Sequence, residues 1–228
     1  MGAGHLVRGL AIQRALDRIG FRGEYRMFGP AQPYARTAGA SSAWTNVEID
    51  PVALASSEHA PASDVAITLR AFDPDVLLVD MFWAPLRHVL PLSRRSRHWL
   101  LLRSYPPTWL EGPPGLPFEP AQFERIVAIE PHLPSLLITH RLEPVVILNP
   151  DEQKPREALR RRLGVTSTET KLVGIMHAGN AGEHARIVEM ANAERDGDGA
   201  DHVVASFDLA VATPTDAAPP SVIGLVRR

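Results

Sequence analysis

Three short, continuously apolar runs, separated by segments of a different character, constrain the fold of this chain most strongly. The runs are Val76–Val79, Trp99–Leu102 and Ile126–Ile129. A strand covered by helices on both faces has this composition, because neither face meets water. Asp73-Pro74-Asp75 precedes the first run and ends a helix that is expected over Ser63–Phe72. This alternation of helix and strand predicts a parallel α/β sheet.

The composition is that of a globular protein with little attraction for polyanions. The 228 residues are 45% hydrophobic and 22% charged, with a net charge of −2, which argues against nucleic acid as a partner. The apolar runs fall far short of the roughly 20 residues that a membrane-spanning helix needs, and no signal peptide is visible. The absence of cysteine excludes disulfides and thiolate ligands and fits a cytoplasmic location.

The first residues form a glycine turn that runs into a helix. Apolar residues at helical spacing predict a helix over residues 5–19, and Gly20 provides a left-handed stop. Gly2 and Gly4 let the backbone approach a ligand closely, and the first N–H groups of the helix are unpaired at its positive dipole end. The turn is therefore a candidate anion site, into which His5 would point its imidazole.

A similar arrangement follows later in the chain. The pattern changes near Asn149–Glu152, and a charged helix, closed by a glycine, is expected over Arg156–Leu163. A strand over Lys171–Met176 leads into a second glycine-rich turn, His177–Gly182, and then into a helix over Glu183–Ala193. Strand, glycine turn and helix thus occur a second time.

This repetition predicts the domain organisation. Residues 1–150 would form one Rossmann-like domain and residues 151–228 a second, incomplete one, each with a parallel sheet. Ligands of such sheets bind in the cleft beyond the carboxyl ends of the strands. Asp80 follows an apolar strand and would lie at that edge, either as a functional group or as the cap of a turn.

Gly2-Ala3-Gly4-His5, with Arg8 and the alanine-rich helix that follows, resembles the N-terminal motif of nucleotide-sugar glycosyltransferases with two Rossmann-like domains. The motif is similar to that of the bacterial transferases that add N-acetylglucosamine to the peptidoglycan lipid intermediate. It is also similar to that of the nucleotide-sugar hydrolases of pseudaminic acid synthesis. Residues 74–80, 144–152 and 173–182 extend the resemblance, and the first eight residues are its most specific part.

The resemblance implies a metal-independent hexosyltransferase that moves a sugar from a nucleoside diphosphate donor, such as a UDP-sugar, to an acceptor hydroxyl, with no further cofactor. His5 would be the catalytic base. The groups that would contact substrate or phosphate come from both glycine turns and from the strand end: Gly2, Gly4, Arg8, Asp80, His177, Gly179, Asn180 and Gly182.

The acceptor is unknown. Arg94, Arg95 and Arg97, beside Phe82 and Trp83, are either a solvated face or a surface that touches an anionic, lipid-linked acceptor. The second alternative requires at most peripheral contact with a membrane.

Two departures from the family pattern leave alternatives open. No strand precedes the first glycine turn, and Thr213–Pro220 stands where a glycine turn and a helix belong. We therefore expect a chain that is truncated at both ends and that binds uridine nucleotides weakly. The alternatives to transfer are hydrolysis, in which water replaces the acceptor, and a non-catalytic remnant that binds a nucleotide or a partner subunit. No metal site is predicted, because His177, Glu183 and His184 lack a metal-ligand spacing.

Overall fold

The chain divides into two compact units. The structure, a computed structural model, describes residues 4–31, 43–103, 117–130, 137–142, 146–165, 167, 170–177, 181–198, 202–208 and 223–227. Residues 4–147 and 218–228 form one unit, and residues 1–3 and 148–217 form the other. The division at residue 148 lies close to the boundary expected at residue 150. The segment 218–228 belongs to the first unit, whereas we expected it in the second.

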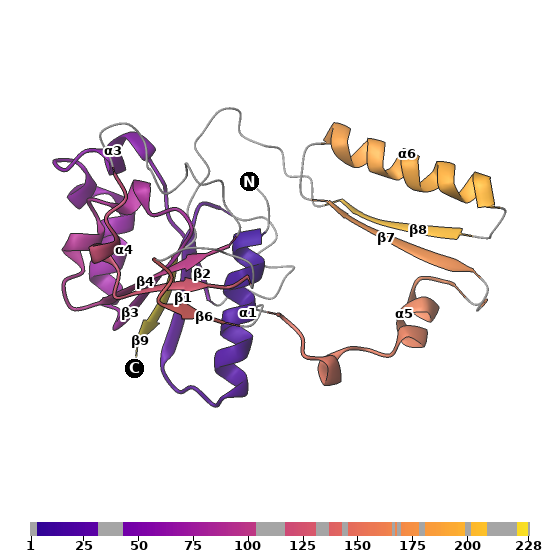
Figure 1. The fold of residues 1–228 in the computed structure, drawn as a ribbon, viewed down its shortest axis with the longest axis horizontal. Helices are drawn as coiled ribbons and strands as arrows, with labels where there is room; N and C mark the ends of the chain where they lie inside the picture. The colour runs from indigo at the N-terminus through magenta and orange to yellow at the C-terminus, as the bar shows by residue number, and fades with distance from the viewer. Residues whose placement is uncertain are drawn as a thin grey trace. The chain divides into compact units, whose positions relative to one another are not determined.

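A seven-stranded sheet forms the first unit, in the order β2-β1-β9-β3-β4-β5-β6 (Figure 1). Its strands are β1 (Glu24–Gly29), β2 (Trp44–Asn46), β3 (Val76–Asp80), β4 (Arg97–Leu102), β5 (Arg125–Ala128), β6 (His140–Arg141) and β9 (Ile223–Arg227). The pairs β1–β2, β3–β4, β4–β5 and β5–β6 are parallel, so the predicted parallel α/β sheet is confirmed. β9 is the exception, because it lies between β1 and β3 and is antiparallel to both.

The helices begin and end at residues suited to these positions. The helices and 3-10 turns of this unit are α1 (Gly4–Arg18), α3 (Pro51–Ala55), η1 (Ala60–Ala62), α4 (Asp64–Phe72), η2 (Ala84–Leu86), η3 (Leu90–Leu92) and η5 (Pro120–Gln122). Gly20, at φ 68°, ends α1 in the left-handed conformation. The Ser63 side chain accepts a hydrogen bond from the N–H of Ala66 and caps α4. Asp73, at φ 45°, ends α4 in the left-handed region and leads into β3.

The two faces of the sheet have different cores, because successive residues of a strand point to opposite faces. Leu77 and Val79 of β3 lie in the main core, which also contains Leu54 of α3 and Leu69 of α4. Residues of α1 pack on the other face in two smaller clusters, with Met27 of β1 in one and with Leu101 and Val127 in the other. Asp80 has the same parity as Leu78, so its side chain points to the face that α1 covers.

The second unit contains a two-stranded parallel sheet of β7 (Lys171–His177) and β8 (His202–Asp208). α6 (Ala181–Asp198) lies along this pair in Figure 1, and α5 (Arg156–Arg162) follows the 3-10 turn η6 (Pro150–Glu152). Arg160 is buried and donates hydrogen bonds from Nη2 to the carbonyls of Ser167 and Thr170, the latter at 2.8 Å. The last turn of α5 is thereby tied to the segment that leads into β7.

Two of the expected strands differ from those observed. The short strand expected over Val47–Ile49 lies at β2 instead, where hydrogen bonds from Met27 N to Ala43 O and from Val47 N to Gly29 O bracket the pairing with β1. The strand expected over Val145–Leu148 is absent from residues 146–148, which the structure describes. The guanidinium of Arg18 donates to the carbonyl of Ile147 at 2.6 Å, so a side chain satisfies this carbonyl. The tail Thr213–Pro220 lies outside the described residues.

Gly9 allows α1 to lie close to β1, and this gives the first prediction. A Cβ atom at Gly9 would collide with the side chain of Met27, which is fully buried. We expect Gly9→Ala to lower the free energy of unfolding by about 1–3 kcal/mol, as overpacking does, although alanine is the better helix former. Urea denaturation measures this change. In a Met27→Ala background the same substitution should cost little, and an equal cost in both backgrounds would contradict the close approach.

The imidazole of His98 joins three segments at the amino end of β4. Nε2 lies 2.9 Å from the Ser93 hydroxyl oxygen, and Nδ1 lies 3.2 Å from the carbonyl oxygen of Gln122. Burial lowers the pKa of His98 below its usual 6.5, although the backbone carbonyls of Gln122 and Ser93 oppose this shift.

A lowered pKa in the folded state predicts a loss of stability at acidic pH. Between the folded pKa and 6.5 the unfolded chain binds more protons at His98 than the folded chain does, so the free energy of unfolding should fall as the pH falls through this window. Urea denaturation at a series of pH values from 7.5 downwards measures this change in the free energy of unfolding. The difference in stability between the wild type and His98→Gln should shrink or reverse at low pH. A difference that does not depend on pH would show that His98 does not couple protonation to folding.

Candidate functional site

His5, Arg8 and Asp80 form a buried polar cluster where α1 begins and β3 ends. His5 and Arg8 are three residues apart and therefore share one face of α1. Asp80 is the last residue of β3. His5 is 7% exposed and Asp80 5% exposed, and the Arg8 side chain is 14% exposed. Because β3 belongs to a parallel set, the cluster lies at the carboxyl edge of the sheet, where ligands of such sheets bind.

One carboxylate oxygen joins the two basic side chains. His5 Nδ1 lies 2.8 Å from Asp80 Oδ2, and Arg8 Nε donates to the same oxygen at 2.8 Å. Arg8 Nη2 is also 2.9 Å from His5 Nδ1. Since a guanidinium only donates, Nδ1 cannot both accept from Arg8 and donate to Asp80. The 2.8 Å approach to Asp80 is a hydrogen bond only when Nδ1 carries a proton, and in that tautomer the lone pair of the ring lies on Nε2.

A strained turn after Asp80 places an aromatic ring against His5. Met81 has a φ of 69°, and the N–H of Phe82 donates to the carbonyl of Asp80 at 2.8 Å, which defines a γ-turn with positive φ. Such backbone strain costs on the order of 1–3 kcal/mol and persists where the surroundings hold it. The Met81 side chain is buried in the main core. The Phe82 ring lies 5.1 Å from the His5 ring, centroid to centroid, and limits its rotation.

Tyr25 of β1 lies beside the cluster and was not predicted as a site residue. Its hydroxyl donates to the carbonyl of Gly9 at 3.1 Å. Burial raises the pKa of Tyr25 well above its usual value, and the negative charge of Asp80 raises it further, so the phenol stays protonated. A cavity of about 10 Å³ lies between Tyr25, His5, Arg8 and Asp80. This space is far too small for a sugar.

The second carboxylate oxygen of Asp80 has no hydrogen-bond donor among the described residues. This atom, Oδ1, is buried. An unpaired buried carboxylate oxygen is costly, and such groups often have a functional role. The arrangement provides a histidine that an aspartate holds in one tautomer, next to an arginine and the first turn of a helix. This is the arrangement of a general base whose conjugate acid is stabilised by a carboxylate.

The structure brings together three of the predicted site residues and leaves the others apart. His5, Arg8 and Asp80 meet, and Gly4 is the first residue of α1. His177 ends β7 and Gly182 lies in the first turn of α6, both in the second unit. The remaining predicted residues, Gly2, Gly179 and Asn180, lie outside the described residues. A cleft shared by His5 and the turn at residues 177–182 stays a prediction.

The three arginines considered as a lipid-facing surface do not share one hollow. Arg94 and Arg95 line a hollow beside α4, together with Asp73. Arg97 belongs to β4 and lies over the Trp99 ring. In the described part of the chain, no three His, Asp or Glu side chains are grouped as metal ligands would be. None of the described helices is both long enough and apolar enough to cross a membrane.

Asp80→Asn tests whether the carboxylate balances a buried cation. Without the negative charge, the guanidinium of Arg8 stays buried without a counter-ion, and we expect the free energy of unfolding to fall by about 3–5 kcal/mol. Thermal and urea denaturation measure the loss. Asp64→Asn, at an exposed carboxylate in the first turn of α4, is the matched control and should cost about 1 kcal/mol or less.

The double variant Arg8→Met/Asp80→Asn removes both charges and should recover part of the loss. Equal losses for the Asp80 and Asp64 variants would mean that the cluster contributes no more than an exposed charge.

Comparison with known proteins does not identify a function for this chain. Neither a family model nor a curated protein matches the chain. The functional argument therefore depends on the histidine, the aspartate that orients it and the arginine beside them.

Proposed function

We propose that this chain is a glycosyltransferase-like protein that transfers a sugar from a nucleoside diphosphate sugar to an acceptor hydroxyl, with His5 as the base. The observation that carries the proposal is the 2.8 Å contact between His5 Nδ1 and Asp80 Oδ2. A histidine paired in this way accepts a proton through Nε2 and is stabilised when it becomes charged. The proposal includes a cytoplasmic reaction, which a chain without cysteine fits.

The reaction requires one bond to form and one to break. The acceptor oxygen bonds to the anomeric carbon of the sugar, while the bond from that carbon to the diphosphate oxygen breaks. The acceptor proton passes to His5 Nε2, and the electron pair of the broken bond leaves with the nucleoside diphosphate. Asp80 then faces an imidazolium, while the guanidinium of Arg8 donates a hydrogen bond to the same Oδ2.

The leaving diphosphate needs positive potential, which helix N-termini supply without a metal. The first turn of α1 carries His5, so a diphosphate near that turn is also near the base. The resemblance implies that the nucleotide binds to the second domain, at the turn predicted over His177–Gly182. The family resemblance supports this division of roles.

The test is release of UDP from UDP-N-acetylglucosamine, measured with and without a panel of hydroxyl acceptors. His5→Asn should lower the rate by at least about 10²-fold, because a positioned base contributes about 10²–10⁴-fold. His59→Asn, at an exposed histidine before η1, is the matched control and should leave the rate unchanged. Asp80→Asn should lower kcat more than it changes KM, since its effect is on the orientation of the base.

The outcomes separate the alternatives. UDP release that requires an acceptor supports transfer, whereas equal release in water supports hydrolysis at the same base. A His5→Asn variant that folds and keeps the wild-type rate would contradict the proposal in either form. Circular dichroism of each variant shows whether a loss of rate is a loss of folding.

A further inference from the structure

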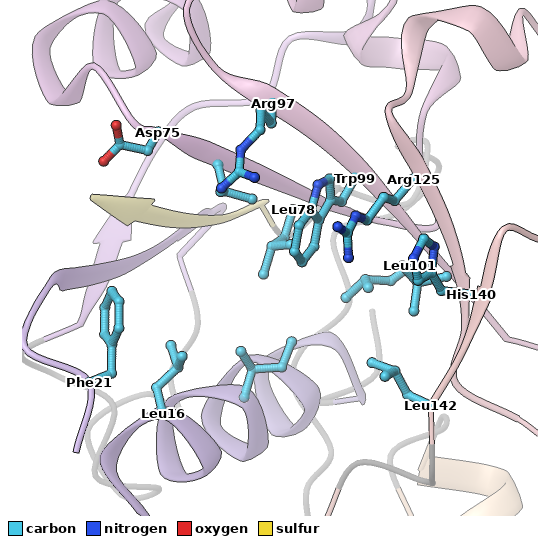
Figure 2. Close-up of a pocket in the computed structure, with 13 residues that line it drawn as sticks. Leu16, Phe21, Asp75, Leu78, Arg97, Trp99, Leu101, Arg125, His140 and Leu142 are labelled. Atoms are coloured by element: carbon cyan, nitrogen blue, oxygen red, sulfur yellow. The ribbon is translucent and has the colours of Figure 1, made fainter. Parts of the chain in front are cut away.

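A second cavity lies on the face of the sheet that α1 covers, at the opposite end of the strands from Asp80. Its volume is about 320 Å³. Figure 2 shows α1 along one side and the strands along the other, with Trp99 pointing into the space between them. The lining includes Arg97 and Arg125, which are the first residues of β4 and β5, and Asp75, which directly precedes β3. The cavity is therefore at the amino ends of the parallel strands.

Most of the cavity wall is apolar. Leu78 and Leu101 come from the sheet, and Leu16 and Phe21 come from α1 and the segment after it. Leu142, which follows β6, is 54% exposed and lies at the rim. Figure 2 shows Leu16 and Phe21 directed towards the strands. Among the helices that the structure describes, α1 alone covers this part of the sheet, so these side chains enclose space instead of closing a core.

One end of the cavity is cationic. The guanidinium carbon of Arg125 lies 4.7 Å from the centroid of the Trp99 ring, and that of Arg97 lies 5.9 Å from it. Trp99 and Arg125 are direct cross-strand partners, which explains why the two side chains stack. A guanidinium stacked on an indole keeps its N–H edge available for a carboxylate or a phosphate.

Trp99 adds a neutral donor to this end. Its Nε1–H is buried, and no acceptor among the described residues reaches it. A buried indole N–H normally has a partner, because burial without one is unfavourable. Glu124 lies 3.7 Å from Arg125 Nε, but both side chains are more than a third exposed, so water screens the pair. Asp75 lies on the far side of Arg97 from Trp99 in Figure 2.

We propose that this cavity binds an anion that carries a single apolar chain, such as a medium-chain acyl carboxylate or an alkyl phosphate. The chain would lie between α1 and Leu78, and the head group would lie between Arg97, Arg125 and Trp99 Nε1. At roughly 30 Å³ per non-hydrogen atom, the volume of a water molecule in the liquid, the cavity holds about ten such atoms. That number corresponds to a chain of about ten carbons, with the head group at the rim.

This site is separate from the His5 cluster. Leu78, Leu101 and Ile12 line both the large cavity and the small one beside Asp80, so these side chains form a wall between the two. The proposal for the large cavity does not depend on the proposed transfer reaction. Loss of activity in a His5 variant would leave it unaffected.

The test is calorimetric titration of the full chain with decanoate and with decyl phosphate, each below its micellar concentration. Decan-1-ol and decyltrimethylammonium have the same chain with a neutral and a cationic head and serve as control ligands. We expect saturable binding of one decanoate or decyl phosphate per chain and much weaker binding of both controls. The anion that binds more tightly identifies the head group as carboxylate or phosphate. Quenching of tryptophan fluorescence that Trp99→Phe abolishes places the ligand in the cavity.

Three variants complete the experiment. Arg97→Gln/Arg125→Gln should weaken decanoate binding by on the order of ten-fold or more, since hydrogen bonds to charged groups are the strong ones. Arg95→Gln, an exposed arginine outside the cavity, should change binding by less than about two-fold. Leu16→Trp fills the apolar end and should abolish binding. Leu16→Trp could disturb folding. The arginines lie at the rim of the cavity, so Arg97→Gln/Arg125→Gln tests the proposal without changing the packing between α1 and the sheet.

Several results would overturn the proposal. If decan-1-ol binds as tightly as decanoate, the cationic end of the cavity does not select an anionic head group. If Arg97→Gln/Arg125→Gln binds decanoate as tightly as the wild type does, the two arginines do not bind the head group. If no probe binds saturably, the cavity is not a ligand site of this kind. If the chain forms dimers that Leu16→Trp abolishes, the cavity is an apolar surface that another copy covers.

Discussion

The ion pair between Arg8 and Asp80, with His5 on the same carboxylate oxygen, connects α1 to the centre of the sheet. Elsewhere α1 is held by small apolar clusters, whereas the opposite face has a large continuous core. The polar cluster therefore fixes where the amino end of α1 lies along β3. A non-directional apolar contact could not specify this position, because leucine and methionine side chains pack in many registers.

The same face of the sheet contains two environments of opposite character, one at each end of the strands. At the carboxyl end, polar side chains are packed so closely that only about 10 Å³ remains. At the amino end, about 320 Å³ is enclosed by apolar side chains and closed by two stacked guanidiniums. Leu78 is the boundary, since it lies two residues before Asp80 on the same side of β3. A substitution of Leu78 would therefore change the packing of both the His5 cluster and the large cavity.

The sequence predicts the parts of this molecule that depend on local pattern. The continuous apolar run of β3, the serine cap of α4 and the glycine stops after α1 and α5 follow from residue type and spacing, and all are present. The meeting of His5 with Asp80 is a contact across the sheet, so the sequence could suggest each residue but not their 2.8 Å contact. Tyr25 was missed, although its alternation with Met27 in β1 places both on the α1 face. The cavity beside Trp99 was missed because it depends on how α1 packs against the starts of three strands that lie far apart in the sequence.

β9 is the last strand in the sequence but lies inside the sheet, so the sheet can be completed only after β9 has been synthesised. This strand separates β1 from β3 and supplies the backbone hydrogen bonds that join β2–β1 to β3–β4–β5–β6. During synthesis, both halves emerge from the ribosome long before residue 223. Each half then presents an open strand edge, which is a template for pairing with other chains. Chaperone binding to nascent chains should therefore persist until β9 is translated, and a stop codon before residue 223 should turn a folding protein into an aggregating one.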